Sequence, residues 1–138
     1  MRYTDEVTPF RAIIADAIGA LSKSRRNTTN IYLDTRVRKA DEAIGPEFQN
    51  IKTRQPCFVV FVDDHPRVNF GHCCSYRFYD AKNQRFLLET PAAFPPYVDD
   101  APKTLIAIHQ PVQPVIGRQE IEFYAKRTQR EPRQRPDR

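Results

Sequence analysis

The first periodic pattern in the chain predicts an amphipathic helix. Apolar residues recur at helical spacing between Phe10 and Leu21, with Ile13, Ile14, Ala17 and Ile18 between them. Thr8 and Pro9 suit the start of such a helix, because threonine can cap exposed amide groups and proline is tolerated in the first turn. We therefore expect one long N-terminal helix with a single apolar stripe facing the core.

Later patterns predict strands. Residues 30–38 alternate between apolar and polar, which is typical of a half-exposed edge strand. Residues 57–62 form a continuous apolar run, which indicates a strand buried on both faces. Alternation resumes over 67–79, and further strands are expected at 84–90 and 104–109. Residues 120–126 fit a strand, although a helical stripe competes there.

These elements predict an α+β fold in which the long N-terminal helix packs on a mainly antiparallel sheet of five or six strands. The two central strands would come from residues 57–79. We expect a single domain over residues 1–125, because the length suits one core, and a basic tail over 126–138. Residues 91–102 carry four prolines, so they predict an extended loop that either binds a partner or packs across its own sheet.

Charge is concentrated at the C-terminus. The chain has a net charge of +5, and the tail accounts for +4 of it through six basic and two acidic residues. The basic residues, which could contact nucleic acid or another acidic surface, are Lys126, Arg127, Arg130, Arg133, Arg135 and Arg138. Guanidinium groups on an extended chain suit phosphates, and such attraction tolerates any base sequence. A solubilising tail that contacts nothing is an equal alternative.

Cysteine and histidine cluster in the predicted central strands. His72 could act as a base, Cys73 or Cys74 as a nucleophile, and Asp63, Asp64 or Asp80 as the group that orients the histidine. On a strand, His72 and Cys74 would share the apolar face, where a core histidine beside a buried thiol is the favoured interpretation. A zinc site that uses His72 and Cys74 is a third hypothesis, but paired metal-ligand spacings such as Cys-x-x-Cys are missing, so no metal or other cofactor is expected.

The three cysteines, together with the lack of an apolar N-terminal run, favour a reducing compartment: the cytoplasm or an intracellular assembly. No apolar window approaches membrane-spanning length, so we expect no membrane contact. The favoured hypothesis is a non-enzymatic binding or assembly module whose folded body docks on a protein and whose tail contacts nucleic acid or an acidic surface. The alternative is a Cys/His-dependent hydrolase or transferase.

One short stretch, Gln113-Pro114-Val115-Ile116-Gly117, resembles the Gln-x-Val-x-Gly hairpin of cystatin-type cysteine protease inhibitors. The stretch lies late in the chain, whereas the family carries it early. The tryptophan of that family's second inhibitory loop has no counterpart, because the chain contains no tryptophan. The sequence therefore assigns the protein to no family.

Overall fold

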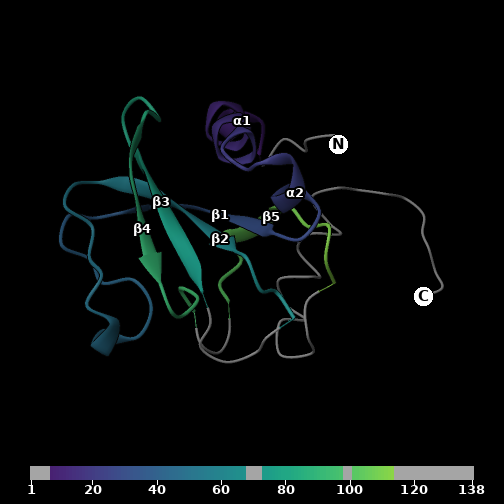
Figure 1. Ribbon diagram of the computed structural model, residues 1–138. Helices are drawn as coiled ribbons and strands as arrows, with labels where there is room; N and C mark the ends of the chain where they lie inside the picture. The colour runs from purple at the N-terminus through teal and green to yellow at the C-terminus, as the bar shows by residue number, and fades with distance from the viewer. Residues whose placement is uncertain (1–6, 68–72, 98–100, 114–138) are drawn as a thin grey trace.

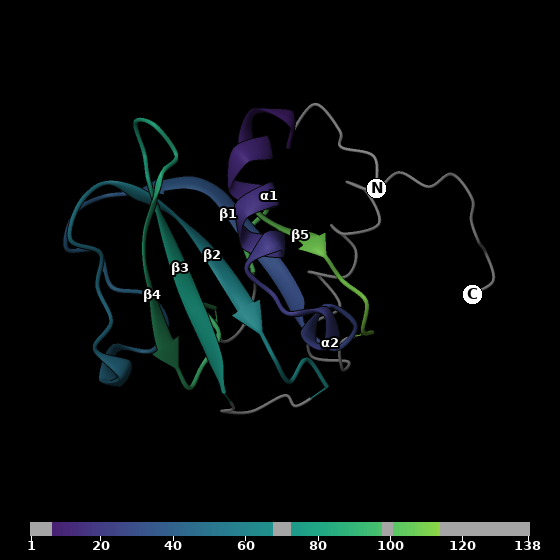
Figure 2. The same cartoon turned by 45° about the horizontal axis from the view of Figure 1, so that its top comes forward.

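The structure, a computed structural model, describes residues 7–67, 73–97 and 101–113. Within these residues the chain forms a five-stranded antiparallel sheet with a short helix lying across one face (Figure 1). The strands are β1 (Asn30–Arg38), β2 (Cys57–Asp63), β3 (Cys74–Asp80), β4 (Phe86–Ala92) and β5 (Leu105–His109). Their order across the sheet is β4-β3-β2-β1-β5 (Figure 2).

The middle strand of the sheet is β2, and every one of its residues is buried. This confirms the prediction of a strand buried on both faces. Its register with β3 runs from Cys57 opposite Asp80 to Asp63 opposite Cys74. The predicted antiparallel arrangement is therefore confirmed, with β2 at the centre and β3 beside it.

The predicted α+β fold built around one long N-terminal helix is wrong, because the protein is mostly sheet. A 3₁₀ turn, η1 (Thr8–Phe10), leads into α1 (Arg11–Gly19), which has only 9 residues. The chain then breaks, and Ser22 starts the separate four-residue helix α2 (Lys23–Arg26), its Oγ accepting a hydrogen bond from the Arg25 amide. Gly19 is a weak helix former and Ser22 is a good cap, so local chemistry ends the helix early.

The apolar stripe nevertheless predicted the correct buried face. Ile13, Ile14 and Ala17 of α1 are buried against the sheet, and Leu21 packs into the same cluster from outside the helix. Leu21 thus continues the helical pattern in the sequence although the helix has already ended. The strand residues of this cluster are Ile31, Leu33, Phe58, Val60, Val62, Tyr79, Ile106 and Ile108.

A second apolar cluster lies on the other face of the sheet, where loops cover it instead of a helix. Ile44 and Ile51 reach it from the segment between β1 and β2, and Tyr97 reaches it from the segment after β4. The segment after β4 thus packs across its own sheet. The strand residues of this cluster are Tyr32, Cys57, Val59, Phe61, Cys74, Tyr76, Phe78, Leu105 and Ala107.

Three further predictions can be compared with the structure. β1 was expected at an edge, but it lies between β2 and β5 and most of it is buried. The strand expected over 84–90 is found two residues later, as β4. β3 begins at Cys74, later than the alternating pattern predicted.

Several predictions concern segments outside the described residues. These segments are residues 68–72, residues 114–117, the strand predicted at 120–126, and the tail.

Candidate functional site

The two adjacent thiols at the start of β3 differ in exposure. Cys73 is exposed, whereas Cys74 is buried with its Sγ 3.5 Å from the carbonyl oxygens of both Ala92 and Phe94. Neighbouring residues of an extended chain point to opposite sides, which explains the difference. His72 lies outside the described residues, so a base at this position stays a prediction.

The two aspartates proposed to orient that base are held by contacts within the fold. Asp63, fully buried at the end of β2, accepts a hydrogen bond of 3.0 Å from the His65 amide through Oδ1. Asp64 pairs with the Arg25 guanidinium at 2.7 Å and accepts a 3.0 Å bond from the Thr29 hydroxyl. These contacts join the end of β2 to the segment around α2. Their proposed part in catalysis stays a prediction.

Cys57 is buried at the start of β2. Burial raises the pKa of its thiol to about 11, against the opposing field of Arg38. A thiolate is the reactive form of cysteine, so Cys57 is an inert apolar group at neutral pH.

Two other expectations concern ligands and membranes. In the part of the chain that the structure describes, no group of three or more His, Cys, Asp and Glu side chains could hold a metal ion. Among those same residues, no helix combines the length and apolar character needed to cross a membrane. The six basic tail residues lie outside this part.

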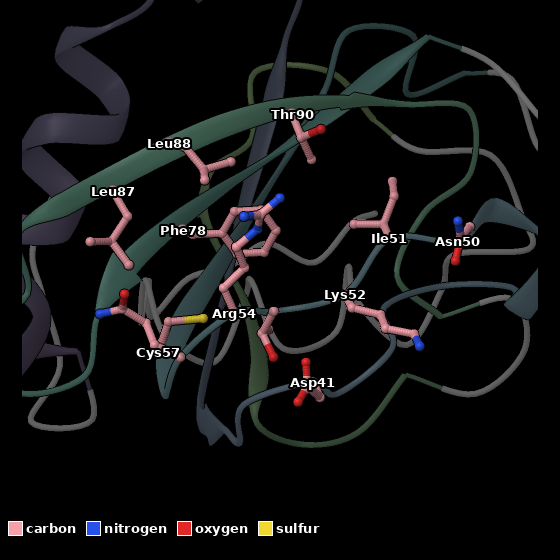
Figure 3. A pocket seen from close by; sticks show the side chains of 12 residues that line it. Asp41, Asn50, Ile51, Lys52, Arg54, Cys57, Phe78, Leu87, Leu88 and Thr90 are labelled. Atoms are coloured by element: carbon pink, nitrogen blue, oxygen red, sulfur yellow. The ribbon is translucent and has the colours of Figure 1, made fainter.

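A pocket of about 440 Å³ opens between β4 and the segment that precedes β2. Phe78 of β3 and Cys57 of β2 line it from the sheet, and Leu87 and Leu88 project toward it from β4 (Figure 3). The remaining lining residues are Asp41, Thr90 and the run Asn50, Ile51, Lys52, Thr53, Arg54 and Gln55. Among the described residues, five of the twelve that line the pocket are apolar and seven are polar or charged.

A β-bulge in β4 explains why two consecutive leucines line one pocket. Leu88 is opposite Phe78 in the β3–β4 register, while Phe86 is opposite Tyr79, so Leu87 is the extra residue. In a regular strand neighbouring side chains point to opposite faces, but a bulge re-aims one of them. Phe86 instead packs on the helix-covered face, where its ring centroid lies 5.8 Å from that of Tyr79.

Two cations on the rim of the pocket have no partner among the residues that the structure describes. Lys52 and Arg54 are exposed, and Thr53 between them is buried with its Oγ donating to the Lys39 carbonyl oxygen. Alternation therefore places Lys52 and Arg54 on the same, outer side of this extended segment. Neither side chain forms a hydrogen bond or an ion pair with any described residue. Asp41 is the one acidic side chain among the described residues that line the same pocket.

Backbone hydrogen bonds hold this rim in place. The Asp41 amide donates to the Thr53 carbonyl oxygen at 2.9 Å, and the Ile44 amide donates to the Ile51 carbonyl oxygen at 2.9 Å. The Thr53 amide donates in turn to the Glu42 carbonyl oxygen at 3.1 Å. The rim is thus a narrow hairpin, so the two cations are carried on an ordered backbone.

A second hollow adjoins the pocket at Ile51, which lines both. Phe48 lines it with 76% of its surface accessible, and the centroid of the Phe48 ring lies 5.2 Å from that of Phe94 in an edge-on contact. Pro91 and Ala92 at the end of β4 complete the wall on the strand side. The two hollows therefore follow β4 along much of its length.

A buried ionic network anchors the segment after β4. The Tyr97 hydroxyl donates to Asp34 Oδ2 at 2.5 Å and accepts from Arg38 Nη2 at 2.8 Å. The side chains of Asp34 and Arg38 are 2% and 4% exposed, and they pair at 3.3 Å. Burial, together with the neighbouring Asp34 carboxylate, raises the pKa of Tyr97. The network contributes to packing, since none of its members lines either hollow.

Sequence reasoning did not identify the pocket, although two signals were present. Phe86, Leu87 and Leu88 are three consecutive apolar residues in a predicted strand, which breaks the alternation of a half-exposed strand. Lys52, Thr53 and Arg54 lie in a stretch too weakly patterned to assign to an element. Neither signal predicts a pocket by itself, because the pocket forms only where the fold places β4 close to residues 50–55.

No protein-family model, no curated protein and no solved structure matches this chain.

Proposed function

We propose that the protein is a non-enzymatic binding module whose folded body docks on another protein along β4. The observation that supports this proposal is the exposure of three consecutive apolar residues on an edge strand. Phe86, Leu87 and Leu88 are 44%, 37% and 43% exposed. By contrast, β2, β3 and β5 carry no exposed residue.

An exposed apolar edge is unusual in a protein that acts alone. Edge strands present unpaired backbone groups, and natural proteins protect them with charges, prolines or covering loops. β4 has Pro91 near one end, but its first three residues carry no such protection. An extended segment of a partner can add to such an edge as a further strand, gaining backbone hydrogen bonds and side-chain pockets together.

The described residues favour binding over cysteine chemistry. Cys57 and Cys74 are buried, and burial raises the pKa of Cys57 to about 11, whereas a catalytic thiol needs a lowered pKa and access to substrate. The Cys/His hydrolase or transferase remains the alternative prediction, and it depends on His72 and Cys73.

Docking along β4 can be tested by panning a phage library of random decapeptides on the immobilised full-length protein. Wild type is compared with the double variant Leu87→Lys/Leu88→Lys, which places charge on the edge. The control is the variant Val37→Lys, because Val37 is an apolar residue of β1 that is 44% exposed, as Phe86 is. We expect enrichment on wild type and on the control, and loss of it on the double variant. Equal enrichment on all three would refute docking at β4.

The basic tail has a separate role in the proposal, namely contact with nucleic acid. Its net charge of +4 supports an electrostatic, sequence-tolerant interaction. Binding to random-sequence duplex DNA should weaken steeply with salt, and deletion of residues 126–138 should abolish it. Binding that does not respond to salt, or that survives the deletion, would exclude this role. Binding to an acidic protein but not to DNA would assign the tail to an acidic surface instead.

A further inference from the structure

We propose that the pocket beside β4 recognises a large apolar side chain of the docked segment together with a nearby carboxylate, which selects acidic partners. This inference rests on the proposed function, because it specifies which segment β4 accepts. Its support is a pocket that combines apolar side chains of the sheet with two cations that have no partner among the described residues.

The apolar half of the pocket suits one large side chain. Phe78 and Cys57 line it from the sheet, and the bulge in β4 directs both Leu87 and Leu88 toward it. A partner strand added to β4 would place alternate side chains on this face, so one of them would lie over the pocket. Burial of an aromatic or leucine side chain there removes exposed apolar surface on both partners.

The charged half supplies the selectivity. Lys52 and Arg54 are carried on a hydrogen-bonded hairpin that faces Leu87 and Leu88 across the pocket, and in Figure 3 the Arg54 side chain extends toward Phe78 while the Lys52 amine points away from it. A carboxylate on the partner would gain a charge-assisted bond to either cation, and an arginine can bind both carboxylate oxygens at once. Asp41, which lines the same pocket, opposes this attraction.

Glu89, an acidic side chain of β4 itself, does not cancel the two cations. Glu89 forms a 2.6 Å ion pair with Arg77 and bonds the Ser75 hydroxyl at 2.7 Å. Arg77 also reaches Asp16 of α1, so these groups belong to the helix-covered face. Asp80 lies closer to the pocket, because its Oδ2 accepts a 2.9 Å bond from Nε2 of the lining residue Gln55, so Asp80 opposes the attraction of a partner carboxylate together with Asp41.

The test extends the peptide panning to a charge reversal. Random decapeptides are selected on wild type, on Lys52→Glu/Arg54→Glu, and on a control, Lys23→Glu/Lys103→Glu, which changes the net charge equally at exposed positions that do not line the pocket. Thermal unfolding of each protein shows that the folds are intact. We expect wild type and the control to select a large apolar residue with a nearby Asp or Glu, and the reversed pocket to select Lys or Arg instead.

A synthetic peptide with the consensus sequence selected on wild type is used to measure how much each variant changes the binding affinity. Fluorescence anisotropy should show about a tenfold or greater loss of affinity for Lys52→Glu/Arg54→Glu, little change for the control, and tighter binding for Asp41→Asn. Enrichment of apolar peptides without any charge preference would overturn the acidic selectivity while leaving docking at β4 intact. Failure to enrich peptides on any of the proteins would overturn the docking itself and this inference with it.

Discussion

The guanidinium of Arg77 on β3 lies 2.8 Å from the carboxylate of Asp16 on α1, and this ion pair ties the short helix to the sheet. The Tyr79 hydroxyl donates to the same carboxylate oxygen at 2.7 Å. Arg77 continues to Glu89 of β4 at 2.6 Å, so one side chain links the helix, β3 and the edge strand. A helix of 9 residues has little stability of its own and depends on such tertiary contacts.

Replacing Asp16 by Asn should make the free energy of unfolding less dependent on pH in the acidic range. Burial acts to raise the pKa of Asp16, but the hydrogen bonds from Tyr79 and Arg77 outweigh it, so the folded-state pKa lies below 3.8. A depressed pKa stabilises the fold above the unfolded-state value, and this contribution is lost as the pH falls through the folded-state pKa.

The side chain of Asp16 is 47% exposed, so water screens the pair and we expect a loss of only about 1 kcal/mol at pH 7. Urea unfolding between pH 5 and pH 2.5 should show a shallower decline for Asp16→Asn than for wild type. The control is Glu47→Gln, an exposed acid outside this network. Parallel declines for wild type and Asp16→Asn would show that the ion pair does not stabilise the fold.

Two glycine substitutions should have opposite effects on stability. Gly19 ends α1, and an added Cβ would meet nothing within 4 Å, so Gly19→Ala should stabilise the protein by roughly 0.5–1 kcal/mol. Gly45 has a φ of +76°, and its Cβ would lie 2.5 Å from Gln49 Nε2 and 2.9 Å from the Tyr76 hydroxyl, so Gly45→Ala should destabilise. Thermal unfolding of both variants checks the signs. A stabilising Gly45→Ala would contradict the described loop geometry.

Removing the Tyr97 hydroxyl should destabilise the loop-covered face. Tyr97→Phe deletes the donor to Asp34 and leaves a buried carboxylate with one bond fewer, at a cost of about 1–3 kcal/mol. The measurement is the urea midpoint, combined with Asp34→Asn in a double-mutant cycle to isolate the coupling. Additive effects of the two changes would mean that the two side chains do not interact in solution.

The three cysteines should differ in reactivity toward iodoacetamide. Cys73 is exposed and should react in the native protein, whereas the buried Cys57 and Cys74 should react only after unfolding. The raised pKa of Cys57, about 11, further suppresses its thiolate at neutral pH. Mass spectrometry at each cysteine across pH gives the result. Rapid labelling of Cys73 or Cys74 below the ordinary thiol pKa would favour the Cys/His enzyme over the binding module.

Periodicity along the chain determined where strands form and which helix face is buried. The continuous run 57–62 predicted a strand buried on both faces, and the stripe through Ile13, Ile14 and Ala17 predicted the contact face of α1. Both features follow from the repeat of apolar residues, which is a local property. The length of the helix did not follow, because Leu21 satisfies the helical spacing while packing from a non-helical segment.

Only the tertiary structure decided strand order and the candidate site. β1 alternates like an edge strand, but β5 pairs with its outer side, and Tyr32, Asp34 and Arg38 of its polar face are buried while Arg36 stays exposed. Asp34 and Arg38 form a buried ion pair that also bonds the Tyr97 hydroxyl. The pocket likewise depends on a bulge in β4 and on a hairpin some 35 residues earlier in the chain. Residues this far apart in the sequence become neighbours through the pairing of strands. The apolar pattern of a single segment does not predict which strands pair.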